Sequence, residues 1–175
     1  MLAARDLVGE EPFAVILPDD LIDSPEKPAL RQMLDIFEQS GDPVIALLKV
    51  ALSDISAYGV IRGERDRGNP RLHLLKELVE KPKQEDAPSD LAIMGRYVLT
   101  PDIFDDLAKT AHDKSGEIQL TNGMRELLKS RPFYALAAKG APRPLRVETE
   151  NRLDAGARFK IRFDLRLTRI FPRRA

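Results

Sequence analysis

Short apolar runs separated by a helical stretch dominate the first third of the chain. Phe13 to Leu17 is an unbroken apolar run, which is typical of a strand buried on both faces, and we expect a central parallel strand there. Pro28 to Gln39 carries its large apolar residues three and four positions apart and is followed by Gly41, which predicts an amphipathic helix with a glycine stop. Pro43 to Val50 is a second apolar run. The order strand, helix, strand predicts a right-handed crossover and a parallel sheet.

The pattern changes after residue 57. A polar turn from Glu64 to Pro70 separates Tyr58-Gly59-Val60-Ile61 from the run that ends at Val79, and this arrangement predicts a hairpin excursion from the sheet. The remaining elements predicted by periodicity are a strand over 91–99, a helix over 121–130, a short strand over 132–138 and an amphipathic strand over 158–170.

Composition restricts the class of protein. The chain has 175 residues, of which 43% are hydrophobic and 32% charged, so we expect one folded domain with a substantial core. No cysteine is present, which excludes disulfides and thiol chemistry. The longest apolar runs are too short to span a bilayer and the first residues lack the features of a signal peptide. A cytoplasmic location with no membrane partner is therefore expected.

Charge divides the chain into two parts. Residues 139–175 hold eleven Lys and Arg against four Asp and Glu, whereas residues 1–138 hold seventeen against twenty-four. This split predicts a main portion over 1–138 and a divergent basic tail of unknown role over 139–175. A nucleic-acid partner is not expected, because no aromatic residues interleave with the arginines on the basic face of the tail.

Polar residues follow the ends of the predicted strands, where open α/β sheets bind ligands. In Leu17-Pro18-Asp19-Asp20 the carboxylates suit Mg²⁺, although Pro-Asp-Asp is also ordinary turn chemistry. Gly59 would let the backbone approach a ligand closely, although a bulge or turn glycine is an equally simple interpretation.

Val79-Glu80-Lys81-Pro82 places a carboxylate and an ammonium at the end of a strand. Glu80 could accept hydrogen bonds from neighbouring sugar hydroxyls, and Lys81 could neutralise a phosphate. A solvated surface ion pair is the alternative. The string Gly116-Glu117-Ile118-Gln119-Leu120-Thr121 precedes the helix over 121–130 and offers Thr121 as a helix N-cap. His73 and His112 are isolated in the sequence and predict no metal site.

These four strings, in this order, resemble bacterial UTP–glucose-1-phosphate uridylyltransferases, also called UDP-glucose pyrophosphorylases. The resemblance runs from about Ala4 to Ala138. It implies an α/β fold, a partial Rossmann-like nucleotidyltransferase domain of the glycosyltransferase-A type, with a mixed, mostly parallel sheet flanked by helices. It also implies uridylyl transfer from UTP to glucose 1-phosphate with Mg²⁺, giving UDP-glucose and diphosphate.

Site residues follow from the same resemblance. Asp19 would be the magnesium ligand, Gly59 with Tyr58 beside it would border the glucose, Glu80 would bind sugar hydroxyls and Lys81 would hold the sugar phosphate. The string from Gly116 to Thr121 would support the site, and Gly95-Arg96-Tyr97 would be a strand-end scaffold lining the sugar pocket.

Both ends depart from the family pattern. Members begin with a glycine-rich loop that cradles the nucleotide, and this chain starts just before the Asp19 strand; after Gly140 the family string does not continue. We therefore expect a truncated copy with impaired turnover and either marginal stability or association into a homo-oligomer. The alternative hypothesis is a non-catalytic remnant or interaction module that keeps the sugar-phosphate half of the site.

Overall fold

The computed structural model describes residues 1–17, 20–111, 116 and 118–144. Its helical elements, with η marking a 3-10 helix, are η1 (Leu2–Ala4), α1 (Arg5–Val8), α2 (Ala29–Ser40), η2 (Leu52–Ala57), η3 (Gln84–Asp86), α3 (Ile103–Lys109) and α4 (Leu120–Ser130). Its strands are β1 (Phe13–Ile16), β2 (Asp20–Asp23), β3 (Val44–Lys49), β4 (Gly59–Arg65), β5 (Leu72–Glu80), β6 (Leu91–Leu99), β7 (Tyr134–Ala137) and β8 (Ala141–Pro144). The strand predicted over 158–170 lies outside the described residues.

Within the described residues, a six-stranded sheet has the order β1-β6-β3-β7-β5-β4, and β4 also pairs with β6. β1 and β3 both run antiparallel to β6, which lies between them, so they are parallel to each other, as the strand, helix, strand order predicts. The predicted hairpin is confirmed as β4 and β5. The predicted helices over 28–39 and 121–130 are confirmed as α2 and α4.

Two expectations about the sheet are wrong for the described part of the chain. The sheet is mixed, as expected, but β3 and β7 are its one parallel pair and the other pairings are antiparallel. β1 lies at the end of the strand order and pairs with β6 antiparallel, so it is not a central parallel strand. It is also not buried on both faces, because its first three residues are half-buried and Ile16 is exposed. An apolar run has the same pattern in either orientation, and the hairpin brings antiparallel pairings of its own.

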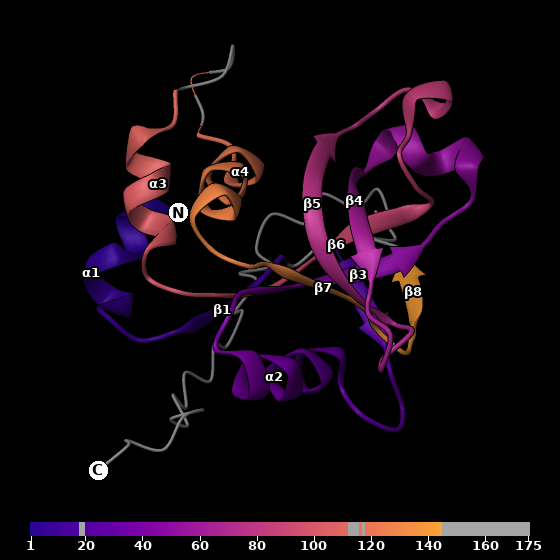
Figure 1. Cartoon of the computed structure of the whole chain (residues 1–175), viewed down its shortest axis with the longest axis horizontal. Coiled ribbons are helices and arrows are strands. Elements are labelled where there is room, and N and C mark those ends of the chain that lie inside the picture. Colours follow the sequence, from indigo (N-terminus) through magenta and orange to yellow (C-terminus); the bar gives the residue numbers. More distant parts are fainter. Residues whose placement is uncertain (18–19, 112–115, 117, 145–175) are drawn as a thin grey trace, which may run out of the picture. The chain divides into compact units, whose positions relative to one another are not determined.

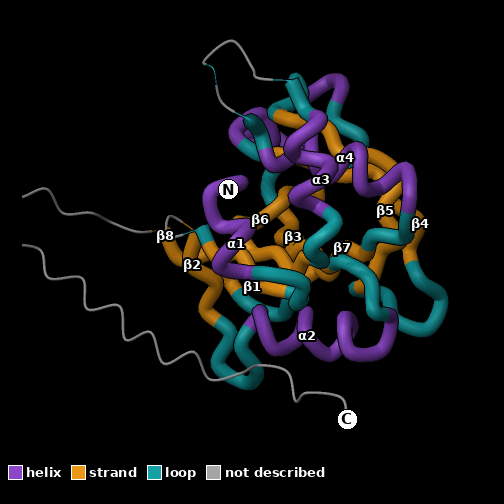
Figure 2. The backbone as a smooth tube through the Cα atoms, turned by 90° about the vertical axis from the view of Figure 1, so that its left-hand side faces the viewer, coloured by secondary structure: helices purple, strands orange, loops and turns teal. Residues whose placement is uncertain are grey.

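Helices cover both faces of this sheet. α2 lies on one side of the strands, whereas α3 and α4 lie on the other (Figure 1; Figure 2). The alternation of side chains along β3 explains the arrangement: Ile45 and Leu47 belong to the buried cluster that includes α3 and α4, whereas Val44, Ala46 and Leu48 are buried outside it. A strand that is apolar on both faces needs a helix on each.

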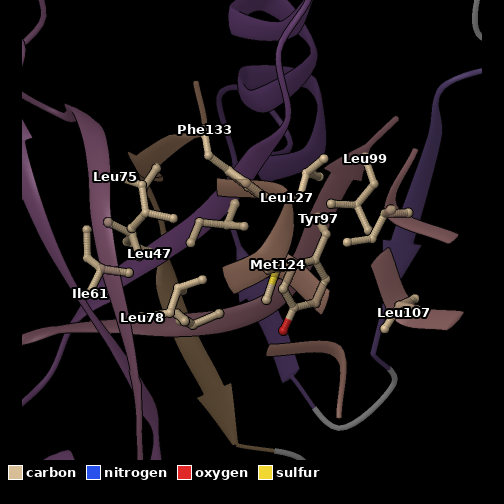
Figure 3. Close-up of a cluster of buried hydrophobic side chains, with 14 of the residues drawn as sticks. Leu47, Ile61, Leu75, Leu78, Tyr97, Leu99, Leu107, Met124, Leu127 and Phe133 are labelled. Atoms are coloured by element: carbon tan, nitrogen blue, oxygen red, sulfur yellow. The ribbon is translucent and has the colours of Figure 1, made fainter. Parts of the chain in front are cut away.

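The main buried cluster lies between the sheet and the helices α3 and α4. Figure 3 shows Leu78 of β5, Tyr97 of β6 and Met124 and Leu127 of α4 within it, and all four side chains are at most 7% exposed. Full burial of a large apolar side chain contributes about 1.5–3 kcal/mol. This packing holds α4 in a fixed position beside β5.

A small antiparallel sheet of β2 and β8 was not predicted. Each strand has four residues, and two of those in β8 are prolines, so neither gives a strand signal in sequence. The first compact unit runs from Met1 to Leu145 and therefore includes β8. The division predicted at residue 139 stays a prediction. In the described part of the chain, no helix combines the length and apolar character that crossing a membrane requires.

Candidate functional site

Two of the predicted strings meet at one end of the hairpin formed by β4 and β5. Gly59 begins β4, Glu80 ends β5, and the two residues are cross-strand partners. The Lys81 N–H donates to the Tyr58 carbonyl oxygen at 3.1 Å, which extends the ladder by one residue. Tyr58, Gly59, Glu80 and Lys81 are therefore neighbours, although the whole hairpin separates them along the chain. We call these four residues the hairpin-end cluster.

A side chain on Gly59 would be crowded by its neighbours. A Cβ built on its backbone would lie 3.1 Å from Glu80 Oε2 and 3.2 Å from Ile93 Cδ1. The Glu80 carboxylate consequently lies against the bare backbone of β4. Gly59 is thus a close-approach glycine toward the Glu80 side chain, whereas approach of a ligand to its backbone stays a prediction. The alternative of a bulge glycine is wrong, because the bulge in the hairpin falls between Arg62 and Gly63.

Thr121 contacts the hairpin-end cluster, although the sequence analysis considered it as a helix N-cap. Its hydroxyl donates a hydrogen bond to Glu80 Oε2 at 3.0 Å. The alternative role as the N-cap of the helix is wrong, because α4 begins at Leu120 and Gln119 occupies the cap position. No local pattern could reveal the contact, since it joins the start of a helix to a strand far back in the chain.

Lys81 has an unusual backbone conformation. Its φ of 44° is the one positive φ among the described residues other than glycine. This left-handed region costs a residue with a Cβ about 1–2 kcal/mol, and the buried Pro82 that follows further restricts the conformation of Lys81. Such strain occurs at functional sites more often than elsewhere, because the surrounding structure must maintain it.

The two charges of the hairpin-end cluster are exposed to solvent. Within the described part of the chain, no ion pair joins Glu80 to Lys81, and the Lys81 ammonium has no carboxylate within salt-bridge distance. The surface ion pair considered as the alternative is therefore not formed between these residues. An exposed ammonium beside a carboxylate whose oxygen is fixed can bind an anionic, hydroxyl-bearing ligand.

Asp19 lies outside the described residues, so its predicted meeting with Lys81 stays a prediction. The chain just before it is fixed at both backbone groups of Leu17. Its N–H donates to the Gly95 carbonyl at 2.7 Å, and its carbonyl accepts a hydrogen bond from Arg96 Nη1 at 2.7 Å. Arg96 is only 8% exposed, so the end of β1 is held by a buried guanidinium.

Gly95 and Arg96 lie inside β6 and not at a strand end, which corrects the expected position of this motif. The register between β3 and β6 shifts there: Ile45 pairs with Tyr97, but Ala46 pairs with Met94. The motif is thus a bulge in the strand that separates β1 from β3. A glycine inside a strand run was the available signal.

Histidine chemistry is not part of the hairpin-end cluster. His73 lies in β5, and burial, followed by the charge of Arg65, holds its pKa below the usual value. His112 lies outside the described residues. Among the residues that the structure describes, no three His, Cys, Asp or Glu side chains gather as a metal site requires.

A pocket of about 370 Å³ at the start of α2 shares no residue with the hairpin-end cluster. The buried Gln32 in its wall is occupied by internal contacts: its Nε2 donates to the carbonyls of Lys27 and Lys139, and its Oε1 accepts from Arg71. These bonds join α2 to the chain after β7. We place the candidate site at the hairpin-end cluster, where exposed charges, a close-approach glycine and backbone strain coincide.

Layered α/β folds with ligand sites at the ends of strands occur in many families, so the family must be identified by comparison with known proteins. The family model for nucleotidyl transferases matches residues 1–143, and the chain belongs to this family.

Two similar curated proteins bear the same enzyme name. The chain is 45% identical to UTP–glucose-1-phosphate uridylyltransferase 2 of Staphylococcus saprophyticus over 138 residues, which is 79% of the chain and 47% of that protein. It is 41% identical to UTP–glucose-1-phosphate uridylyltransferase YngB of Bacillus subtilis, covering 80% of the chain and 46% of the relative. The chain thus spans about half the length of the curated relatives that it matches.

Solved structures agree with the sequence comparison. An apo UDP-glucose pyrophosphorylase superimposes with a TM-score of 0.76 at 45% identity, covering 81% of this chain and 51% of the other. A UDP-glucose pyrophosphorylase complexed with UDP-glucose gives 0.75 at 44% identity, covering 81% and 53%. These similarities confirm the expected fold class and the resemblance on which the expected site rests.

Proposed function

We propose that this chain carries the sugar-phosphate part of a UTP–glucose-1-phosphate uridylyltransferase site. In that reaction an oxygen of the glucose 1-phosphate attacks the α-phosphorus of UTP, the bond to the β-phosphate breaks, and diphosphate leaves with UDP-glucose as the product. The observation that carries the proposal is the hairpin-end cluster, in a chain whose relatives bear this enzyme's name.

Glu80 and Gly59 would bind the sugar. The Glu80 carboxylate is an acceptor, and it can take hydrogen bonds from adjacent hydroxyls. This carboxylate lies close to Gly59, and the sugar would lie beside these two residues, with Tyr58 at the border. These contacts would orient the hexose and fix the direction in which its phosphate points.

Lys81 would bind the phosphate of the sugar. Its ammonium has no carboxylate partner in the described part of the chain, so its charge is available for a phosphate oxygen. By neutralising that phosphate, Lys81 would reduce its repulsion from the triphosphate and keep the attacking oxygen in line. No covalent enzyme intermediate is needed.

Magnesium would be held by Asp19, as the family resemblance implies. The donor type fits, because Mg²⁺ prefers carboxylate oxygens together with substrate phosphates. Two hydrogen bonds fix Leu17, two residues before Asp19. When bound, the ion would neutralise charge on the phosphates.

Further proposals concern the cellular location, the boundary of the nucleotidyltransferase portion and self-association. We propose a cytoplasmic metabolic role, and we place the division between the nucleotidyltransferase portion and the basic tail near the predicted residue 139. The match of the family model to residue 143 and the end of the first compact unit at Leu145 support a division in this region. Self-association is proposed as well, and light scattering would measure it.

Titration calorimetry with glucose 1-phosphate and with UTP, each in the presence of Mg²⁺, tests the proposal. Binding of glucose 1-phosphate that is lost in Lys81→Ala and in Glu80→Gln would support it, and a coupled assay for diphosphate would measure turnover. Binding of the sugar phosphate without UTP binding or turnover would favour the remnant or interaction module. No binding of glucose 1-phosphate would refute the assignment of this site.

A further inference from the structure

One oxygen of the Glu80 side chain is held by a residue of another element. Oε2 accepts the Thr121 hydroxyl at 3.0 Å, and the same atom lies 3.1 Å from the position that a Cβ on Gly59 would occupy. The residues come from β4, β5 and α4, which are far apart in the sequence. An exposed carboxylate on a flexible side chain would otherwise sample several rotamers.

The negative charge of Glu80 is electrostatically favourable near the start of α4. The first turn of this helix contains no acidic residue. The amino end of a helix carries partial positive charge, which favours a nearby anion. Glu80, held by Thr121 in that first turn, supplies the anion from a neighbouring strand.

α4 itself is fixed against β5, so Thr121 cannot easily withdraw. Arg125 Nε, one turn further along the helix, donates to the Leu78 carbonyl of β5 at 2.9 Å, and its Nη1 donates to Asn122 Oδ1 at 2.9 Å. Two residues of α4 one turn apart thus contact two residues of β5, Leu78 and Glu80. This pair of contacts makes the position of the Thr121 hydroxyl a property of the fold.

We propose that Thr121 is a positioning residue for Glu80 and that it sharpens selection among hexose 1-phosphates. This inference rests on the proposed function. With Oε2 held by Thr121, the carboxylate presents Oε1 in a fixed direction, so it accepts well only from hydroxyls of matching configuration. The string that ends in Thr121 then acts on the sugar through Glu80.

Calorimetry with glucose 1-phosphate and its 4-epimer, galactose 1-phosphate, tests this role in the intact chain. For Thr121→Val we expect binding of glucose 1-phosphate to weaken roughly five- to tenfold, the order of the net contribution of one ordinary hydrogen bond, because Thr121 acts on the sugar only through Glu80. The epimer should lose less, so the preference for glucose shrinks. Thr121→Ser should restore both affinities, because it keeps the hydroxyl.

Two further variants separate positioning from general damage. Thr110→Val is the matched control, because Thr110 is the C-cap residue of α3 and its hydroxyl donates to the Asp106 carbonyl of that helix; it should leave both affinities unchanged. In a Glu80→Gln background, Thr121→Val should cost much less than it does in the parent chain. Thermal melting checks the fold, and Thr121→Ala replaces the valine variant if the valine loosens α4.

The outcomes distinguish this inference from the proposed function. If the parent chain binds glucose 1-phosphate and Thr121→Val keeps both the affinity and the preference, the positioning role is wrong and the function stands. Equal loss for both epimers with no rescue by serine would also overturn positioning, because general damage has that signature. If the parent chain binds neither sugar phosphate, the proposed function fails and the inference fails with it.

Discussion

Replacing Lys81 by glycine separates the backbone of this residue from its side chain. With φ at 44°, the left-handed conformation costs lysine about 1–2 kcal/mol, and glycine adopts it freely. Glycine also makes the unfolded chain more flexible, which costs about 0.5–1 kcal/mol. The free energy of unfolding of Lys81→Gly should therefore stay unchanged or rise by about 1 kcal/mol, which raises the melting temperature by about 0–4 °C.

Loss of the Lys81 side chain is expected to weaken ligand binding, although the backbone becomes less strained. Lys81→Gly removes an ammonium that the proposed function places on the sugar phosphate, and a hydrogen bond between charged groups contributes about 1.5–3 kcal/mol. Glucose 1-phosphate should thus bind roughly ten- to a hundredfold more weakly. The variant would be at least as stable as the parent and impaired in binding, which is the relationship expected at a strained functional residue.

Lys83→Gly is the matched control. Lys83 is also an exposed lysine, only two residues further along, but its φ is −65°. It has no strain to relieve, so Lys83→Gly should lose about 0.5–1 kcal/mol of stability and keep its affinity. Chemical denaturation compares the stability of the two glycine variants, and calorimetry compares their affinity for glucose 1-phosphate. Lys81→Ala should bind weakly and keep the backbone strain.

Two results would refute the reasoning about Lys81. If Lys81→Gly loses as much stability as Lys83→Gly, then the left-handed conformation stores no strain at this position. If Lys81→Gly binds glucose 1-phosphate as tightly as the parent chain does, then the ammonium is not the phosphate ligand. The two conclusions are independent, because denaturation tests the first and calorimetry tests the second.

Three other substitutions test separate features. Gly59→Ala places a Cβ 3.1 Å from Glu80 Oε2, so affinity for glucose 1-phosphate should fall about tenfold in calorimetry with little change in melting; an unchanged affinity would contradict the close approach. Because burial lowers the pKa of His73 in the fold, the unfolded chain takes up the proton first, and stability should fall as pH drops through about 6.5. The urea midpoint of His73→Gln should fall less between pH 7.5 and 5.5 than that of the parent, and an equal fall would count against the shift. In Gly123→Ala the new Cβ would lie 2.7 Å from Leu107 Cγ, so crowding should outweigh the helix propensity gained and cost about 1 kcal/mol in denaturation; a more stable variant would show that the two helices can separate.

Local patterns predicted the elements of this fold better than their arrangement. The helical spacing around Met33 and Phe37 and the glycine at 41 gave α2 its correct limits within a residue or two, because a helix is determined by residues close in sequence. The direction of β1 was not predictable, since its apolar run carries no information about which strand will lie beside it. Pairing with β6 depends on residues that come eighty or more positions later.

The candidate site was likewise predicted only in part. The family resemblance assigned Gly59 and Glu80 to one sugar site, and the hairpin that brings them into contact was predicted separately from its polar turn. The bond from Thr121 to Glu80 was not predicted, since it depends on how α4 packs against β5, and packing is set by side chains scattered over the chain. The positive φ of Lys81 had no sequence signal either, because lysine is an unusual residue for that conformation.

The place of β6 in the sheet has a consequence for synthesis of the chain. In the described pairings, β1 and β3 lie beside β6, and β3 also beside β7, so both strands find their neighbours only in residues that are translated later. At about 5–20 residues per second, these two apolar segments spend several seconds outside the ribosome before Leu91–Leu99 follows. Nascent chains halted before that strand should be held by chaperones, and those halted after it should begin to resist protease.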